Sequence, residues 1–345
     1  MQFSTDLSTA SVDVLAPRSR ILIVKLGALG DVVYTLPLLH RLRAALPEAF
    51  IAWAVEPRAR AIVDGHPELD AAIVLDRSRG PAGFWRFLRQ IRALRFDAAI
   101  DAQRLLKSGA IAAISGSRLR AGFDRARSKE LSFLFTNRRT PGLPAPRHMV
   151  EQYLELGDLL GLPPVETRFV LPAPLTSTAA PADAEVLIGI GAGKPANRWP
   201  VASWARLVEG LEATGRSIAL VGGGTLEQRT AAEIRAATKA PFVDLVGRTT
   251  IAEVAALLSR ARLHVGLDSG ITHLACALGK PVVAIYGAAD ERRTGPWGPR
   301  ARIVRRRPSC SPCGRRQCPL GTIACMRDLS AQEVLQAARD ALDRS

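Results

Sequence analysis

Asp31 is the acidic residue whose position in this sequence most suggests chemistry. It stands in ILIVKLGALGDVVYTLP (21–37), after an apolar run and two glycines. A carboxylate there can cap the helix that follows, because the first turn of a helix has unpaired backbone N–H groups. It can also take a proton from a substrate hydroxyl if it faces a binding cleft. The two roles are compatible, and spacing alone leaves both open.

A second polar group stands in VGLDSGITHLACALGKP (265–281). A strand is expected to end at Asp268 and a helix to run from about Ile271 to Gly279. The first turn of that helix would attract a phosphate through its free N–H groups and the positive end of its dipole. The same turn supplies a glycine for close approach and further donors: Ser269, Gly270, Thr272 and His273. The alternative is that Asp268 or Ser269 caps the helix and His273 packs inside.

Two more predicted strand ends combine glycines with charges. VGGGTLEQR (221–229) is neither the spaced dinucleotide fingerprint nor a Walker loop, since no Lys-Ser/Thr pair follows. Gly223 could admit a ribose or base and Glu227 could hold ribose hydroxyls, although a tight turn is equally consistent. In GAGKPANRWPVASW (191–204), Lys194 and Arg198 precede a helix start, and cations beside a glycine loop suit a diphosphate. A solvated loop is the alternative there.

Strands and helices alternate along both halves of the chain. Unalternated apolar strands separated by helices indicate a parallel sheet covered on both faces. The predicted strands are 21–25, 50–55, 71–76 and 97–101, then 185–193, 217–224, 242–247, 262–268 and 281–287. The sequence therefore predicts an α/β fold with two doubly wound, Rossmann-like domains facing a central cleft. The predicted boundaries are a loose tail over 1–19, a domain over 20–172, a linker over 173–183, a domain over 184–328 and a C-terminal helix within 329–345.

Composition limits the partners. The 345 residues are 48% hydrophobic and carry a formal net charge of +15, which favours anionic partners. Aromatic residues make up 5%, too few for a platform that stacks single-stranded nucleic acid. An arginine-rich genome would give the same charge without any partner. No run approaches about 18 apolar residues, and the first nineteen lack a secretory signal, so a cytoplasmic protein is expected.

Four segments, taken in order, resemble one known family. They are KLGALGDVVYTLPLL near the start, FDAAIDAQRLLKSG (96–109), NRWP (197–200) and VGLDSGITHLACALGKPVVAIYG (265–287). Together they look like the ADP-heptose:lipopolysaccharide heptosyltransferases of glycosyltransferase family 9, from about residue 20 to 340. The segment CSPCGRRQCPLGTIACM (310–326) is most similar to the heptosyltransferase II branch.

The resemblance implies a GT-B fold with an N-terminal acceptor domain, a C-terminal nucleotide-sugar domain and a last helix that crosses back to the first domain. It implies an inverting reaction without metal or other cofactor. Asp31 matches the catalytic base, and Asp268, Ser269, Gly270 and His273 match the donor loop. An inner-core lipopolysaccharide acceptor would bring the enzyme to the inner face of the inner membrane, in peripheral contact with anionic lipid.

The sequence departs from the family in two places. Asn197 stands where relatives carry a lysine, so Lys194 or Arg198 would contact the diphosphate instead. Arg104 stands where a glycine is common, which would alter the acceptor pocket. The residues expected to border an anionic acceptor, each equally consistent with an ordinary surface position, are Gly30, Gln103, Lys107, Arg138 and Arg139.

Four of the five cysteines lie close together in the sequence, at Cys310, Cys313, Cys318 and Cys325. Four thiolates could hold a structural zinc or iron, but the spacing to the last two is not that of a standard zinc finger. The prediction is therefore no metal, with this set as the less favoured alternative.

The leading hypothesis is heptose transfer from an ADP-sugar, with no nucleic-acid partner. The nearest alternative is a family 9 enzyme with a different nucleotide-sugar donor or a non-lipopolysaccharide acceptor. A nucleic-acid-binding protein would show steeply salt-dependent binding and no response to ADP-sugars. A nucleotide-binding regulator would bind ADP without turnover.

Overall fold

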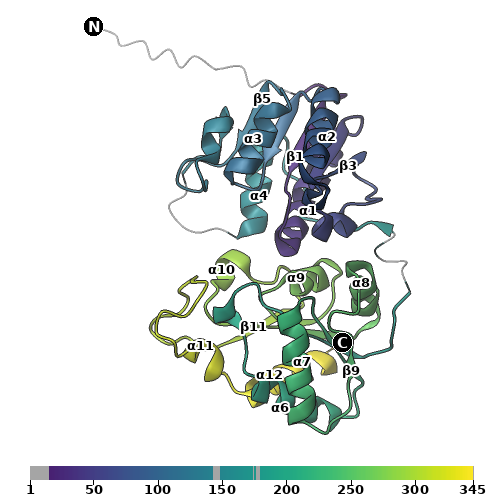
Figure 1. Ribbon diagram of the computed structural model, residues 1–345, viewed down its shortest axis with the longest axis vertical. Coiled ribbons are helices and arrows are strands. Elements are labelled where there is room, and N and C mark those ends of the chain that lie inside the picture. Colours follow the sequence, from purple (N-terminus) through teal and green to yellow (C-terminus); the bar gives the residue numbers. More distant parts are fainter. Residues whose placement is uncertain (1–14, 143–147, 174, 176–178, 345) are drawn as a thin grey trace.

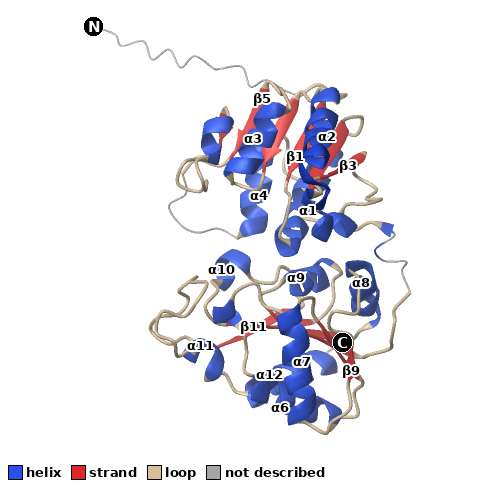
Figure 2. Ribbon diagram, in the orientation of Figure 1, coloured by secondary structure: helices blue, strands red, loops and turns tan. Residues whose placement is uncertain are grey.

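The computed structural model describes residues 15–142, 148–173, 175 and 179–344. These residues form two lobes, each built around a six-stranded sheet with helices on its faces (Figures 1 and 2). Residues 1–14 of the predicted tail, and 174 and 176–178 of the predicted linker, lie outside the described residues. Ser19 is already fixed, because its side chain is buried and its carbonyl accepts the N–H of Phe50.

The first sheet is parallel and has the strand order β3-β2-β1-β4-β5-β6. Its strands are β1 (Arg20–Val24), β2 (Phe50–Val55), β3 (Ala71–Val74), β4 (Ala98–Asp101), β5 (Leu119–Gly122) and β6 (Arg138–Arg139). Its α-helices are α1 (Leu29–Ala45), α2 (Gly80–Ala93), α3 (Leu106–Ile114) and α4 (Met149–Asp158). Short 3₁₀ helices are η1 (Pro57–Ile62), η2 (Arg77–Arg79) and η3 (Ser132–Phe135).

The second sheet repeats the same winding, with the order β12-β11-β10-β7-β8-β9. Its strands are β7 (Val186–Gly189), β8 (Ile218–Val221), β9 (Val243–Asp244), β10 (Leu263–Leu267), β11 (Val282–Tyr286) and β12 (Ala301–Arg305). Its helices are η4 (Pro195–Asn197), α6 (Val201–Glu212), α7 (Thr225–Ala237), α8 (Ile251–Arg260), α9 (Gly270–Ala277), α10 (Glu291–Thr294), α11 (Ala324–Arg327) and α12 (Ala331–Asp343). Two Rossmann-like sheets in tandem confirm the predicted GT-B architecture.

Each sheet reverses its strand order beside its first strand, between β1 and β4 and between β7 and β10. Ligands of open α/β sheets bind at such switch points, beyond the carboxyl ends of the strands. Asp31, in the first turn of the helix after β1, and Arg104, Lys194 and Asp268, in the loops after β4, β7 and β10, lie just beyond these strands. The topology therefore directs chemistry-bearing residues of both lobes to comparable positions.

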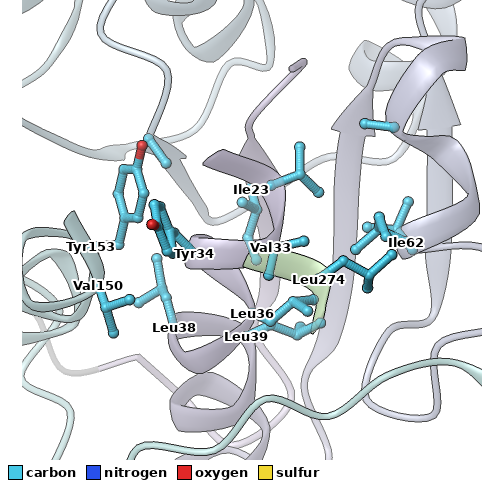
Figure 3. Close-up of a cluster of buried hydrophobic side chains, with 14 of the residues drawn as sticks. Ile23, Val33, Tyr34, Leu36, Leu38, Leu39, Ile62, Val150, Tyr153 and Leu274 are labelled. Atoms are coloured by element: carbon cyan, nitrogen blue, oxygen red, sulfur yellow. The ribbon is translucent and has the colours of Figure 1, made fainter. Parts of the chain in front are cut away.

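The lobes meet where α1 packs against α9. Leu274 of α9 lies against Leu36 of α1 within one continuous buried cluster (Figure 3). Two glycines permit this close approach: a Cβ on Gly30 would lie 2.6 Å from His273 Cδ2, and one on Gly270 would lie 2.7 Å from Leu29 Cβ. The first turns of α1 and α9 are thus held against each other.

The C-terminal helix was expected to pack back toward the first lobe, and this expectation is wrong. Helix α12 packs on α6 and on strands β10, β11 and β12 of its own lobe. Its buried face belongs to the core cluster of the second lobe, with Leu335 against Gly210 and with Val334, Ala338 and Leu342 also buried. An amphipathic pattern shows that a helix has a buried face, but it does not show which lobe covers that face.

His264 of β10 gives the second lobe a pH-dependent stability. Its side chain is fully buried, with Nε2 3.1 Å from Thr272 Oγ1, and burial lowers its pKa to about 3. The unfolded chain binds this proton near the ordinary pKa of 6.5. Stability is therefore complete above that value and decreases as pH falls toward the folded pKa.

We expect this group alone to lower the free energy of unfolding by roughly 2 to 3 kcal/mol between pH 6.5 and 4.5. Urea unfolding at the two pH values measures it. The variant His264→Gln, whose side chain does not titrate, should lose correspondingly less over the same interval. Equal losses in the variant and the wild type would contradict the assignment.

Candidate active site

A cavity of about 430 Å³ lies between the lobes and is lined by residues of both. Those that carry the argument are Gly30, Asp31, Tyr34, Arg104 and Lys129 from the first lobe, and Lys194, Asp268, Ser269, Gly270, His273 and Arg293 from the second. The carboxylate of Asp31 and the start of α9 therefore share one space. Among the described residues, no helix is both long and apolar enough to cross a bilayer.

Asp31 lies in the first turn of α1 but does not cap it. The N-cap residue is Ala28, and no side chain makes a capping hydrogen bond there. The carboxylate instead pairs with Lys25 at 3.3 Å, while 38% of its side chain remains exposed. Lys25 lies at the carboxyl end of β1, 1% exposed, and its ammonium donates to Tyr153 Oη at 2.7 Å and to the Ala102 carbonyl at 3.2 Å. The buried ammonium of Lys25 thus orients the Asp31 carboxylate, and the exposed part of the carboxylate faces the cavity.

The charges around Asp31 keep it ionised. Burial by itself raises the pKa of this carboxyl, but Lys25 and Arg104 outweigh burial and hold the pKa below its ordinary value. For Lys25, burial lowers the pKa and the Asp31 carboxylate raises it, with a net increase. The pair therefore stays charged at neutral pH, and Asp31 is available as a proton acceptor.

The variant Lys25→Met tests this coupling. Without the ammonium, the effect of burial on Asp31 is less opposed, so its pKa should rise. We expect the acid limb of the kcat/KM profile for transfer to move to higher pH than in the wild type. Lys107→Met is the matched control, because it breaks an ion pair with Glu56 outside the cavity. Superimposable profiles for Lys25→Met and the wild type would contradict the role given to Lys25.

On the second lobe, Asp268 anchors a polar cluster that reaches across to α1. Its Oδ1 lies 3.3 Å from His273 Nε2 and accepts the hydroxyl of Tyr286 at 3.2 Å. The other ring nitrogen of His273, Nδ1, lies 2.7 Å from the hydroxyl of Tyr34. Burial, and then the Asp268 carboxylate, raise the pKa of Tyr34 well above its ordinary value, so the phenol stays neutral. Asp268 therefore orients His273 and joins the lobes.

The backbone N–H groups in the first turn of α9 are not capped by a side chain. Its N-cap residue, Ser269, makes no side-chain capping hydrogen bond, and its hydroxyl lies 3.3 Å from Thr272 Oγ1. The Thr272 hydroxyl donates to the Leu267 carbonyl at 2.7 Å. The first-turn N–H groups thus lie at the cavity without a capping side chain. This is the arrangement that binds a phosphate.

Four cations surround the same cavity: Arg104, Lys129, Lys194 and Arg293. Burial lowers the pKa of Lys129, and the nearby charges of Arg104 and Arg293 lower it further. Arg104 is 8% exposed, and its Nε has no hydrogen-bond partner among the described residues. Like charges crowded together with an unpaired donor leave room for an anion of more than one charge.

Two predicted donor residues line a separate cavity of about 260 Å³. Arg198 and Glu227 lie there together with Trp199 and Leu226. The loop between β7 and α6 lines both cavities, since Lys194 faces the first and Arg198 the second. Glu227 accepts the N–H of Gly224 at 3.0 Å and so caps its own helix. Gly223 lines neither cavity.

Four predicted acceptor residues do not line the central cavity. Gln103 accepts the N–H groups of Leu26 at 3.0 Å and Gly27 at 3.4 Å, which holds the turn before Asp31. Lys107 pairs with Glu56 at 3.0 Å. Arg138 lies in edge strand β6, whose neighbour Arg139 donates to the Thr136 carbonyl at 2.8 Å. Gly30 does line the cavity, where it gives room to His273.

Sequence reasoning missed Lys25, Tyr34, Lys129 and Arg293. Lys25 left a signal, because a lysine ending the apolar strand ILIVK must be buried and therefore needs a partner. Lys129 and Arg293 stand in ordinary charged segments, SKEL and DERRTG. Only the fold brings these two to the cavity.

The four C-terminal cysteines lie near one another in the second lobe. All are free thiols, and Cys325 is buried, which together with the neighbouring thiols raises its pKa. No group of three or more His, Cys, Asp or Glu within the described residues could hold a metal ion.

Two facing Rossmann-like lobes and the cavity between them define a class, the glycosyltransferases of GT-B fold. The sequence profile of glycosyltransferase family 9 (heptosyltransferase) matches residues 84–324. Lipopolysaccharide heptosyltransferase 1 of Salmonella typhimurium is 30% identical over 293 residues, covering 81% of this chain and 92% of the relative. The enzyme of the same name from Pseudomonas aeruginosa is 30% identical over 312 residues, 87% of either chain. The chain therefore belongs to glycosyltransferase family 9.

Solved structures show the same two-lobed fold. A family 9 glycosyl transferase from Veillonella parvula superposes with a TM-score of 0.79 at 22% identity, covering 95% of this chain and 98% of the other. Escherichia coli heptosyltransferase WaaC with ADP gives 0.74 at 26% identity, covering 93% and 99%. Lipopolysaccharide heptosyltransferase 2 of E. coli is 27% identical over 311 residues, 83% of this chain and 88% of the relative. Identities of 30% and 27% do not separate the two heptosyltransferase branches.

Proposed function

We propose that this enzyme transfers heptose from ADP-heptose to an anionic inner-core lipopolysaccharide acceptor, with inversion at the anomeric carbon and with Asp31 as general base. One observation carries the proposal: the Asp31 carboxylate and the uncapped start of α9 line the same cavity from opposite lobes. A carboxylate can activate a hydroxyl there, and a helix N-terminus can receive a departing diphosphate.

The donor is assigned to the second lobe. Relatives support ADP-heptose, since WaaC has been solved with ADP and with ADP-2-deoxy-2-fluoro heptose. In our proposal the diphosphate lies at Ser269 and Gly270, with Lys194 and Arg293 beside it. The nucleoside occupies the neighbouring cavity, where Glu227 can accept from ribose hydroxyls. Lys194 thus takes the place of the cation that Asn197 does not supply.

The acceptor is assigned to the first lobe. Arg104 and Lys129 line the cavity on the same side as Asp31 and would bind an anionic group of the acceptor saccharide. A buried arginine with an unpaired Nε gains most from such a partner, because its desolvation is already part of the folded state. The acceptor hydroxyl would then lie within reach of the Asp31 carboxylate.

The reaction is a single displacement. As the acceptor oxygen bonds to the anomeric carbon, its proton passes to Asp31 and the bond from that carbon to the β-phosphate oxygen breaks. The electron pair stays on the diphosphate, whose new charge meets the N–H groups of α9 and the two cations. Asp31 then releases its proton to water. No step requires a metal, and we expect EDTA to leave the rate unchanged.

Release of ADP, GDP or UDP from a panel of nucleotide-sugars tests the proposal, with a core-oligosaccharide acceptor present or absent. Acceptor-dependent release from ADP-heptose alone is the expected result. Faster release from another nucleotide-sugar would favour the alternative, a family 9 enzyme with a different donor. Because the acceptor is lipid-anchored, the enzyme would work in peripheral contact with the inner face of the inner membrane.

A further inference from the structure

The outer face of α2 and α3 combines exposed apolar side chains with arginines. Helix α2, GPAGFWRFLRQIRA, contains three arginines and no acidic residue. It buries Phe87, Leu88 and Ile91 but leaves Phe84 and Trp85 exposed, at 42% and 63%. Leu106 and Ile114 of the adjacent α3 are 48% and 39% exposed. We call this surface the α2–α3 face.

Two hollows lie between these helices. The one between the N-terminal half of α2 and the length of α3 has a volume of about 490 Å³. It is mostly apolar, lined by Leu75, Phe84, Leu88, Ala110, Ile111 and Ile114, and Arg77 and Lys107 also line it. The one at their C-terminal ends has about 850 Å³ and is lined by Arg89, Arg92, Arg95 and Arg118. Asp97 also lines it, but its carboxylate accepts the backbone N–H of Arg20 at 2.7 Å. The two hollows are adjacent, since Leu88 and Ile114 line the first and Arg89 and Ser115 line the second, so one surface offers an apolar hollow next to concentrated positive charge.

The arginines of this face lack acidic partners. Within the described part of the chain, no carboxylate forms an ion pair with Arg86, Arg89, Arg92, Arg95 or Arg118. Arginines elsewhere in the same lobe are held differently: Arg43 pairs with Asp70 at 2.6 Å, and Arg127 with Glu155 at 2.6 Å. The α2–α3 face is therefore complementary to an extended anionic surface rather than to its own protein.

We infer that the α2–α3 face docks on a bilayer of anionic phospholipid. Exposed tryptophan and phenylalanine suit the boundary between headgroups and acyl chains, and arginines near an anionic leaflet are attracted to its negative potential. A protein partner would bring acidic side chains to discrete arginines, whereas these arginines form a row over the C-terminal half of α2 and continue past its end, next to an apolar hollow. The inference rests on the proposed function, since a lipid-anchored acceptor gives the docking its purpose.

The position of the face suits that purpose. The apolar hollow includes Lys107, which pairs with Glu56 at 3.0 Å. The N–H of Glu56 donates to the Leu26 carbonyl at 2.8 Å, in the turn that leads to Asp31. The hollow therefore lies at the same carboxyl edge of the first sheet as the base. A bilayer seated there would present the lipid-anchored acceptor at the cleft.

Binding to vesicles of phosphatidylglycerol and phosphatidylcholine, with pure phosphatidylcholine as the reference, tests the inference. We expect the triple variant Arg86→Gln/Arg89→Gln/Arg92→Gln to bind anionic vesicles about a hundredfold more weakly, at roughly fivefold for each arginine. The matched control, Arg206→Gln/Lys239→Gln/Arg248→Gln, removes the same charge from the second lobe. It should bind almost as the wild type does.

Trp85 gives an independent readout because its side chain is exposed, while Trp53, Trp199 and Trp204 are buried and Trp297 is partly buried. Brominated lipid should quench the fluorescence of the wild type, and Trp85→Phe should abolish most of that quenching. Equal loss of binding in the two triple variants, or undiminished quenching in Trp85→Phe, would overturn the inference, as would binding to a protein but to neither vesicle. Transfer to a soluble, deacylated acceptor should be normal in all these variants, so failed docking is separable from a failed function.

Discussion

Asp31→Asn should lower kcat for transfer by about a thousandfold while the Kd for ADP stays within about twofold of the wild-type value. The amide keeps the shape of the side chain but cannot accept the acceptor proton at neutral pH. The diphosphate site on α9 belongs to the other lobe and is unchanged. Steady-state kinetics with titration calorimetry for ADP measures both quantities.

Asp290→Asn is the matched control for this variant. Asp290 also lines the cavity, but its carboxylate already accepts the N–H of Arg292 at 3.1 Å and pairs with its guanidinium at 2.8 Å. We expect less than a tenfold change in kcat. Asp31→Asn also leaves the buried ammonium of Lys25 without a carboxylate to balance its charge. The double variant Asp31→Asn/Lys25→Met should therefore be more stable than Asp31→Asn and equally inactive. Transfer by Asp31→Asn at more than a tenth of the wild-type rate would exclude Asp31 as the base.

Substitution of the cavity cations should separate donor from acceptor binding. Arg293→Gln should weaken ADP binding by about tenfold to a hundredfold, the range for loss of one charge-assisted hydrogen bond. Lys129→Gln should raise the acceptor KM by a similar factor with little change in ADP affinity. The two substitutions should differ because the residues line the cavity from different lobes. Arg293 belongs to α10 of the second lobe, which is assigned to the donor, and Lys129 belongs to the first lobe, which is assigned to the acceptor.

The neighbouring residue provides the control for Arg293. Arg292 has the same side chain one position earlier, but its guanidinium is exposed and bound to Asp290. Arg292→Gln should therefore leave ADP affinity nearly unchanged. Two results would contradict the assignment of donor and acceptor to separate lobes. One is equal ADP affinity in Arg292→Gln and Arg293→Gln. The other is a Lys129→Gln variant whose affinity for ADP falls as much as its affinity for the acceptor.

The central strands of both sheets could be predicted from the sequence because they are buried on both faces. The predicted strands 21–25 and 50–55 correspond to β1 and β2, and 281–287 includes β11. The strands β5, β6 and β12 were missed. They carry arginines, as in ARIVR of β12, because they lie at or near the sheet edges where side chains reach solvent. Local periodicity cannot distinguish such strands from loops.

The site was predictable where one loop carries several functional groups and unpredictable where single residues converge. Asp31 and the 268–273 turn stood out because each follows a buried strand, and both line the cavity. Gln103 was placed in the acceptor site for the same reason, yet its side chain turns back to hold the Leu26 and Gly27 amides. Lys129 lies in the loop between β5 and η3, and Arg293 lies in the short helix α10. Their positions depend on how the lobes meet, which no short segment encodes.

The anomeric configuration of the product tests the central claim most directly. Nuclear magnetic resonance of the product from a donor of defined configuration distinguishes displacement assisted by a base from displacement through a covalent intermediate. If Asp31 takes the acceptor proton in a single displacement, the new glycosidic bond must have the configuration opposite to that of the donor. A product that retains the donor configuration would contradict that role and point to attack by a protein nucleophile.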